Sequence, residues 1–515
     1  MRLQNYSKYL LIIIAFLAAI VVRWWFIPGG AISFAYDQAR DGFIVQELLQ
    51  GDLKLLGPSV SGVPGLAHGV LYYYLIAPAY YFGHGDPRIV AYFLSFMGAL
   101  GVFTTFSLSF LLTKKVLPSI LSAFIFAFSF ESVQYANLLT NASMGVWFTP
   151  LVYIGLYLWI KKAWKWSPIF TGLSLGLAVQ SEVALAYHFA PIIFWLSIFR
   201  KEIKLKDVLI SGLSFLVAVS TMIASEVKFG FPGIKGVLYL LGGQDQISGG
   251  KELSDFISIF LNQTGKTFAF NIFPLNIVFG GILGFFMLIY STASEWGIIK
   301  KEILTWQTFL ASYILAHFLA LPFGGTNMRH LMVGAGVGIA VFTGIFISKY
   351  FSKNKIIFAA AILMVIGSNI YKTFKENING QTIFPLQLDL VLSKELKAID
   401  YTYMKADGKP FSISTLTSPL HVNTLWSYLY NWYGKEKYGY IPYWVGRDQV
   451  GTLGNNLGTP PSNVTNHFFI IEPTYGIPEL WVTYAKGDQE SMSGFIEKTN
   501  FGEIVVEERM MKNEK

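Results

Sequence analysis

Cysteine is absent from this sequence, and charged residues are scarce. The 515 residues include no Cys, which excludes disulfide bonds, thiolate metal sites and cysteine nucleophiles. Only 14% of the residues are charged, whereas 53% are hydrophobic. A soluble domain rarely has this balance, because its surface needs more charge. The composition therefore predicts a membrane protein, and an aromatic content of 17% fits rings that lie at lipid interfaces.

Nucleic-acid binding and metal binding have little support in the sequence. The net charge of +8 is a topology signal in a membrane protein, so it does not argue for a nucleic-acid partner. Asp37, Asp41 and Glu182 carry the oxygen ligands that suit Mg²⁺ or Mn²⁺. However, no His-x-x-x-His or comparable cluster is present. We therefore predict neither a metal nor another cofactor.

Apolar runs recur along the first 372 residues and have the length that a helix needs to cross a bilayer core of about 30 Å. Twelve runs are candidates, at 8–27, 68–83, 87–112, 116–131, 143–160, 167–182, 184–199, 206–226, 268–291, 304–322, 331–349 and 355–372. The first run lacks an A-x-A-like cleavage site and ends in RWWF, so we expect a retained helix and not a removed signal peptide.

The positions of Lys and Arg test which runs cross. Short basic connections should be cytoplasmic, and they occur at Lys114–Lys115, Lys161–Lys165, Arg200–Lys206, Lys300–Lys301 and Lys349–Lys355. If all twelve runs cross from a cytoplasmic N-terminus, every one of these connections falls outside. If 68–83 does not cross, all of them fall inside. The sequence therefore predicts eleven crossings in a cell membrane, with the C-terminal region outside.

The run 68–83 has its own reasons not to cross. The segment HGVLYYYLIAPAYYFG is short, rich in Tyr and interrupted by Pro78. These features suit an interfacial or re-entrant helix.

Residues 373–515 differ in composition and predict a small mixed α/β domain outside the membrane. FSISTLTS and NHFFIIEP are typical of strands, and TLWSYLYNWYG is typical of an amphipathic helix that ends at Gly434. The predicted fold class is thus an all-α polytopic membrane protein, covering residues 1–372, with this domain appended. From its position, we expect the domain to cap a site in the membrane part or to help choose a substrate.

Two acids lie close to the predicted outer surface. In FAYDQARDGF (34–43), Asp37 and Asp41 are four residues apart, so on a helix they share one face beside Arg40. The run YDQARDGFIVQELLQGDLK predicts an amphipathic helix that stops near Gly51. A loop rich in Gly and Pro (57–69) and the Tyr-rich segment follow.

This order of features resembles the polytopic glycosyltransferases of the GT-C fold, especially the protein mannosyltransferases and lipid A aminoarabinose transferases. The resemblance rests on the acidic motif at Asp37, the helix end at Gly51–Asp52, the 57–69 loop, Phe82–Gly83 and Arg88, and on MRHLM at 328–332. It covers 8–112 most clearly and extends to about residue 372. The chain is most similar to the microbial dolichyl-phosphate-mannose and RgtA/B/C/D-like branch.

Two departures from the family pattern are visible. Related enzymes often have Asp-Glu in the first outer loop, where this chain has Asp37–Gln38. A second outer acid, expected near 131–143, is replaced by Asn141 in LLTNASMG.

The resemblance implies an inverting hexosyl or pentosyl transfer from a polyprenyl-phosphate-linked sugar to a glycan, lipid or protein acceptor, within an outer catalytic loop at 28–86. Asp37 is then the expected general base and Asp41 the second choice. The expected ligands of the donor phosphate are Arg329, His330 and Arg88, since Arg matches phosphate oxygens. The expected substrate-binding residues are His68, Asn141, Gln180, Glu182 and His188.

Each of these residues also has a plain structural interpretation. Asp37 and Asp41 can solvate a helix, Arg329 and Arg88 can snorkel at helix ends, and Asn141 can cap a helix. The whole chain has alternatives too: a transporter or lipid flippase, a polysaccharide polymerase or ligase, or a membrane anchor for the C-terminal domain. Polar residues concentrate at the outer helix ends and not at helix centres, which favours the transferase.

Overall fold

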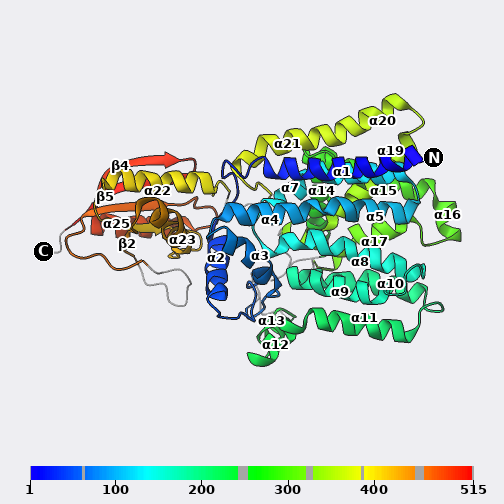
Figure 1. Ribbon diagram of the computed structural model, residues 1–515, viewed down its shortest axis with the longest axis horizontal. Coiled ribbons are helices and arrows are strands. Elements are labelled where there is room, and N and C mark those ends of the chain that lie inside the picture. Colours follow the sequence, from blue (N-terminus) through cyan, green and yellow to red (C-terminus); the bar gives the residue numbers. More distant parts are fainter. Residues whose placement is uncertain are drawn as a thin grey trace.

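A bundle of helices and a smaller sheet-containing domain lie end to end in the computed structural model (Figure 1). The structure describes residues 2–60, 64–241, 253–320, 329–383, 388–446 and 457–512. The helices of the bundle are α1 (Arg2–Trp24), α2 (Tyr36–Leu49), α3 (Leu71–Phe82), α4 (Pro87–Ala99), α5 (Gly101–Thr113), α6 (Val116–Phe128), α7 (Phe130–Ala136), η1 (Asn141–Met144), α8 (Gly145–Ile160), α9 (Ser167–Ser181), η2 (Val183–His188), α10 (Phe189–Ile198), α11 (Leu205–Ala218), α12 (Ser220–Lys228), α13 (Pro232–Leu241), α14 (Leu253–Ile272), α15 (Ile277–Ser294), α16 (Trp296–Lys301), α17 (Trp306–Ile314), η3 (Ala316–Ala320), η4 (Arg329–Met332), α19 (Ala335–Phe351), α20 (Lys355–Ile362), η5 (Leu363–Gly367), α21 (Ser368–Glu376) and η6 (Asn377–Asn379).

Several of these helices are long and apolar enough to cross a membrane. Among the described residues, four single stretches qualify: Pro87–Thr113, Asn141–Ile160, Ile277–Ser294 and Lys355–Asn379. Two bent pairs would raise the number to six, namely α6 with α7 at 53° and α11 with α12 at 61°. The chain is a membrane protein, and the eleven crossings stay a prediction.

Helices α2 and α3 lie at the end of the bundle that faces the C-terminal domain (Figure 1). Helix α2 begins at Tyr36 and ends at Leu49, so the predicted amphipathic helix is confirmed. Helix α3 has 12 residues and contains Pro78. At 1.5 Å per residue it is about 18 Å long, too short for a bilayer core of about 30 Å, which supports the prediction that this run does not cross.

The basic connections gather at the opposite end. Lys161, after α8, lies 3.2 Å from Glu302, which follows α16. Lys349, near the end of α19, pairs with Glu295 between α15 and α16. The N-terminus and α16 lie at this same end in Figure 1. The segments predicted to be cytoplasmic therefore share one end of the bundle, and the direction of that end across the membrane stays a prediction.

The apolar run predicted at 268–291 is not one helix. A turn at 273–276 divides it, and its first part belongs to α14, which begins earlier, at Leu253. Helices α14 and α15 then pack against each other so closely that a Cβ on Gly284 would lie 2.3 Å from the Phe268 side chain. Polar residues of α14 face the core of the bundle and lower the hydropathy of this helix. Its first part was therefore not predicted from apolar runs.

The C-terminal domain contains a five-stranded sheet with the order β2-β1-β3-β5-β4. Strands β2 and β3 pair with β1 in parallel, whereas β5 pairs antiparallel with β3 and β4. Its elements are α22 (Leu392–Ala406), β1 (Ser412–Leu416), α23 (Thr424–Leu429), η7 (Tyr430–Gly434), α24 (Lys435–Tyr438), β2 (Tyr443–Trp444), β3 (Asn466–Ile471), α25 (Glu479–Met492), β4 (Ser493–Phe501) and β5 (Ile504–Met511). A mixed α/β domain is confirmed.

The predicted helix end at Gly434 is wrong. Gly434 has a helical φ of −61°, and the helix continues to Gly439, which has the left-handed φ of 82° that ends it. Gly434 is needed for another reason, because a Cβ there would lie 2.7 Å from the Tyr403 hydroxyl.

The C-terminal domain is docked on α2. A Cβ on Gly42 of α2 would lie 2.6 Å from the ring of Tyr428, which belongs to α23. The Tyr428 hydroxyl donates to the carbonyl of Gly85 at 2.7 Å, and the Leu392 amide donates to the carbonyl of Ile32 at 3.1 Å. The acidic helix therefore lies between the rest of the bundle and the C-terminal domain.

Candidate active site

Asp37, Arg40 and Asp41 form a cluster on α2, named here the surface cluster. Arg40 Nη1 donates to Asp37 Oδ1 at 2.7 Å, and Arg40 Nη2 donates to Asp41 Oδ1 at 2.8 Å. The spacing of three residues along a helix brings Asp37 and Arg40 together. One arginine therefore holds both carboxylates.

The Gln38 side chain accounts for the first departure from the family pattern. Its Oε1 accepts the Ala35 amide at 2.9 Å, at the start of α2. Gln and Glu both serve as the third residue of such a capping arrangement. Gln38 thus fixes the start of the helix that carries Asp37.

The two carboxylates have different surroundings. The Asp37 side chain is 52% exposed, whereas that of Asp41 is 4% exposed. The Tyr73 hydroxyl, from α3, donates to Asp41 Oδ1 at 3.2 Å. Burial raises the pKa of Asp41 to about 6, and the charge of Arg40 opposes this shift. Asp37 is the carboxylate that a substrate can reach, while Asp41 ties α2 to α3.

His68 and Glu182 form a second layer beside the surface cluster. His68 Nδ1 lies 3.7 Å from Glu182 Oε1 and accepts the Val183 amide at 3.2 Å. Burial lowers the pKa of His68 to about 3, with contributions from nearby His330 and Arg40. Burial also raises the pKa of Glu182, in the connection between α9 and η2, to about 8. At neutral pH this contact joins a neutral imidazole to a protonated carboxyl and is not an ion pair.

His330 faces the same region from η4. It is half-buried, and burial lowers its pKa to about 4, against the opposing charge of Asp37. The pKa of His68 responds to Arg40 and His330, and that of His330 responds to Asp37, so three segments distant in sequence, at 37–40, 68 and 330, contribute to this region. Near Asp37 the site therefore offers neutral imidazoles and a single arginine among its described residues.

Three other predicted substrate residues bind the chain itself. Gln180 Nε2 donates to the Ala218 carbonyl at 2.7 Å and to Thr221 Oγ1 at 2.9 Å. Asn141 Nδ2 donates to the Ser181 carbonyl at 2.6 Å. His188 Nδ1 lies 2.8 Å from the Tyr153 hydroxyl. Each of these contacts joins α9 or η2 to a neighbouring segment, and a substrate-binding role for these residues stays a prediction.

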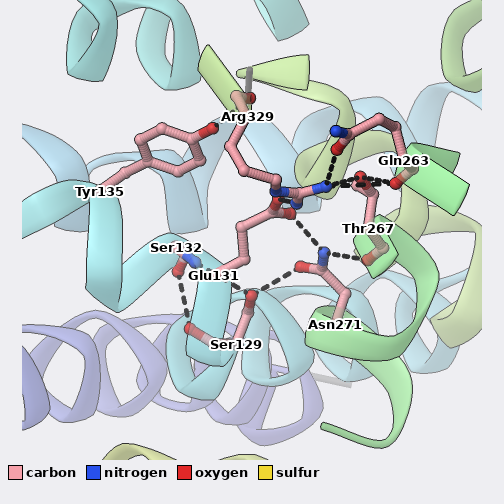
Figure 2. Close-up of polar contacts among 8 residues, drawn as sticks. All are labelled: Ser129, Glu131, Ser132, Tyr135, Gln263, Thr267, Asn271 and Arg329. Carbon is pink, nitrogen blue, oxygen red and sulfur yellow. Dashed lines mark hydrogen bonds and ion pairs between the residues drawn. The ribbon is translucent and has the colours of Figure 1, made fainter. Parts of the chain in front are cut away.

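Arg329 is enclosed in a buried polar network between α7, α14 and η4 (Figure 2). Its Nη2 pairs with Glu131 Oε1, and the two side chains are 3% and 2% exposed. Its Nη1 donates to the carbonyl and Oε1 of Gln263, each at 3.1 Å, and to Thr267 Oγ1 at 3.0 Å. We call Glu131 and Arg329 the buried pair.

The same network continues on the other carboxylate oxygen. Asn271 Nδ2 donates to Glu131 Oε2 at 2.6 Å and to the Thr267 carbonyl at 2.8 Å (Figure 2). Ser129 Oγ donates to Asn271 Oδ1 at 2.6 Å. Both oxygens of Glu131 are thus hydrogen-bonded. The series of hydrogen bonds extends from η4 through α14 to the junction of α6 and α7.

Arg88 lies apart from these contacts. Its Nε donates to both carboxylate oxygens of Asp86, at 3.0 and 2.9 Å, at the start of α4. These hydrogen bonds are the largest influence on the charge of Arg88, and Tyr92 and Tyr433 make smaller contributions. A role in binding the donor phosphate stays a prediction.

Arg40 and Glu131 were not among the residues that we predicted for the site. Arg40 had a signal, because it follows Asp37 by three residues on a predicted helix. Glu131 had a weaker one, as a lone acid at the end of an apolar run. Within the described ranges, no group of three or more His, Asp or Glu side chains is placed to hold a metal ion.

Comparison with solved structures identifies the fold. ArnT from Cupriavidus metallidurans, in a crystal structure with bound undecaprenyl phosphate, matches with a TM-score of 0.57 at 10% identity, covering 96% of this chain and 97% of ArnT. An oligosaccharyltransferase from Archaeoglobus fulgidus, in complex with Zn and sulfate, gives 0.49 at 14% identity and covers 96% and 72%. The oligosaccharyltransferase AglB of the same organism, with an inhibitory peptide and a dolichol-phosphate, gives 0.46 at 12% identity and covers 99% and 75%.

The likeness to ArnT shows that the chain has the GT-C fold, as the sequence resemblance predicted. No protein-family model and no curated protein sequence matches the chain.

Proposed function

We propose that the protein is a membrane glycosyltransferase that moves a sugar from a polyprenyl-phosphate carrier to an acceptor at the outer face of the membrane. The observation that carries this proposal is the surface cluster: an exposed carboxylate, Asp37, held beside Arg40 at the end of a GT-C bundle. The fold match is to a protein whose structure contains undecaprenyl phosphate, which supports a donor of that chemical class.

Asp37 is the general base in this proposal. An acceptor hydroxyl or amine attacks the anomeric carbon of the donor sugar, and its proton passes to the Asp37 carboxylate. The bond from that carbon to the phosphate oxygen breaks, and polyprenyl phosphate leaves with the electron pair. A single displacement inverts the anomeric centre. A positioned base of this kind contributes about 10²–10⁴-fold to the rate.

Arg40 is the cation that we assign to the leaving phosphate. Negative charge develops there during the displacement, and a guanidinium matches phosphate oxygens in geometry and charge. Arg40 lies beside Asp37 and has a partly exposed side chain. Both arginines are bonded to side-chain oxygens, but the Arg40 side chain is 15% exposed and that of Arg329 only 3%, which favours Arg40 for this role.

His68, His330 and Glu182 complete the proposed pocket as neutral groups at pH 7. Neutral imidazoles and a protonated carboxyl can hydrogen-bond sugar hydroxyls without repelling the carboxylate base. Among the residues assigned to the reaction, the charged ones would then be Asp37, which takes the proton, and Arg40, which binds the phosphate.

A transfer assay tests the proposal. Membranes containing the wild type or Asp37→Asn are incubated with a panel of radiolabelled polyprenyl-phosphate sugars. Asp37→Asn is expected to lower turnover by about 10²–10⁴-fold. Asp52→Asn is the matched control, because it removes another exposed aspartate that pairs with a cation, Lys54, just after the same helix. Equal turnover by wild type and Asp37→Asn would refute Asp37 as the base.

A further inference from the structure

We propose that the buried pair is a positioning device that holds η4, and through it His330, against the surface cluster. This inference rests on the proposed function and deepens it. It gives Arg329 and Glu131 a role in turnover that needs no contact with the substrate.

The surroundings of the buried pair argue that it does more than stabilise the fold. Removing two charges from water costs about as much as their attraction returns, so a buried ion pair adds little net stability. Charged side chains inside a membrane bundle tend to be retained for function. Here the two charges bring with them Asn271, Gln263 and Thr267, all buried (Figure 2). The protein thus keeps a buried network around Glu131 and Arg329 whose charges cost free energy to remove from water.

The place that this network fixes is the short helix η4. The Arg329 side chain is clamped to α7 and α14, and the Arg329 carbonyl accepts the Tyr135 hydroxyl at 2.9 Å. The Leu331 carbonyl accepts the Tyr187 hydroxyl at 3.0 Å. His330 therefore lies between two residues whose carbonyls each accept a hydrogen bond from a tyrosine hydroxyl.

His330 is the residue of η4 that faces the proposed reaction. The Tyr187 that holds η4 belongs to η2, whose first residue, Val183, donates its amide to His68 Nδ1 at 3.2 Å, so η4 is tied to the segment beside the surface cluster. The charge of Asp37 also acts on the pKa of His330. A misplacement of about 1 Å at a reacting centre can lower a rate by about 10²-fold. Loosening η4 would move His330 relative to Asp37 without touching either side chain.

The test separates this role from simple folding by removing both charges together. Glu131→Leu and Arg329→Met each leave one unpaired charge in the core, and both single variants are expected to lose thermal stability. The double variant Glu131→Leu/Arg329→Met removes both charges, so its thermal midpoint is expected to return close to that of the wild type. Its kcat is expected to remain about 10- to 100-fold below wild type, while the KM for the donor lipid stays within about 3-fold.

Two further measurements complete the experiment. Adding His330→Ala to the double variant is expected to give no further loss beyond His330→Ala alone, because both changes remove the same element. The chain has only seven His residues, so the ¹³Cε1–¹H signal of His330 can be assigned by its disappearance in His330→Ala. That signal is expected to shift in the folded double variant.

Three results would overturn the inference. Full turnover by the folded double variant would make the buried pair purely structural. A raised donor KM with unchanged kcat would make Arg329 a ligand of the donor phosphate. An unmoved His330 signal in the folded double variant would contradict the positioning role even if no donor sugar were turned over, so failure of the inference and failure of the proposed function can be told apart.

Discussion

The surface cluster and the buried pair use the same two chemical groups in opposite surroundings. Asp37 and Arg40 are three residues apart on one helix, and the Asp37 side chain is 52% exposed. Glu131 and Arg329 are 198 residues apart in sequence and almost fully buried. An exposed pair adds only about 0–1 kcal/mol of stability, but its carboxylate remains free to meet a substrate. Exposure, more than charge pairing, separates the group that can react from the group that orders the fold.

After the loss expected for Asp37→Asn, breaking the surface cluster at its arginine should have the next largest effect on the reaction. If Arg40 stabilises the departing phosphate, Arg40→Gln should lower kcat by about 10²–10³-fold, the loss expected for a group that stabilises charge in a transition state. Transfer assays with the donor found for the wild type would measure this. Arg40→Lys keeps the charge without the fork, so we expect it to retain part of the activity. Full activity in Arg40→Gln would place the phosphate elsewhere.

The surface cluster and the buried pair also differ in how much of each could be predicted from the sequence. Asp37, Asp41 and the extent of α2 followed from spacing within one short segment. The partner of Arg329 did not, because Glu131 lies far away in the sequence and only the packing of α7 against α14 brings them together. The sequence therefore pointed to Arg329, through MRHLM, but could not indicate Glu131 as its partner, and its predicted role at the donor phosphate stays a prediction.

Helix α14 and Gly434 show a similar limit. The polar residues Gln263, Thr267 and Asn271 lower the hydropathy of α14, yet they are buried because they face the network. Gly434 and Gly439 look equivalent in sequence, and only backbone angles and contact with Tyr403 distinguish close packing from a helix end. Local patterns predicted helices well, whereas buried polar contacts depend on the tertiary fold.

Glu182 sharpens the comparison, because it is a buried acid with no arginine beside it in the described contacts. Its nearest described partner is neutral His68 at 3.7 Å, and burial raises its pKa to about 8. An unfolded chain releases this proton near pH 4.3, so from about pH 5 to pH 8 the folded state binds more protons than the unfolded state. The Glu182 contribution to stability should therefore fall as the pH rises through this window and level off above it.

Thermal midpoints of purified wild type and Glu182→Gln across this pH range would check that linkage. The difference between the two curves isolates Glu182 from the other acids. Because the amide does not titrate, Glu182→Gln should show a flatter profile and gain most relative to wild type near pH 8. Parallel profiles would mean that Glu182 keeps an ordinary pKa and is charged beside His68.

The substitution Gln38→Glu restores the Asp-Glu pair of related enzymes, and it should have the smallest effect on turnover. Gln38 caps the start of α2 through its Oε1, which accepts the Ala35 amide at 2.9 Å, and a glutamate carboxylate can accept the same hydrogen bond. A negative charge there also suits a helix N-terminus, where it is worth about 0.3–1 kcal/mol. Gln38→Glu should thus leave turnover within about twofold of wild type, while Gln38→Leu, which loses the cap, should lower both stability and turnover. A large gain in turnover with Gln38→Glu would show instead that a second acid beside Asp37 takes part in the chemistry, and the cluster would then need two carboxylates to do what we assign to one.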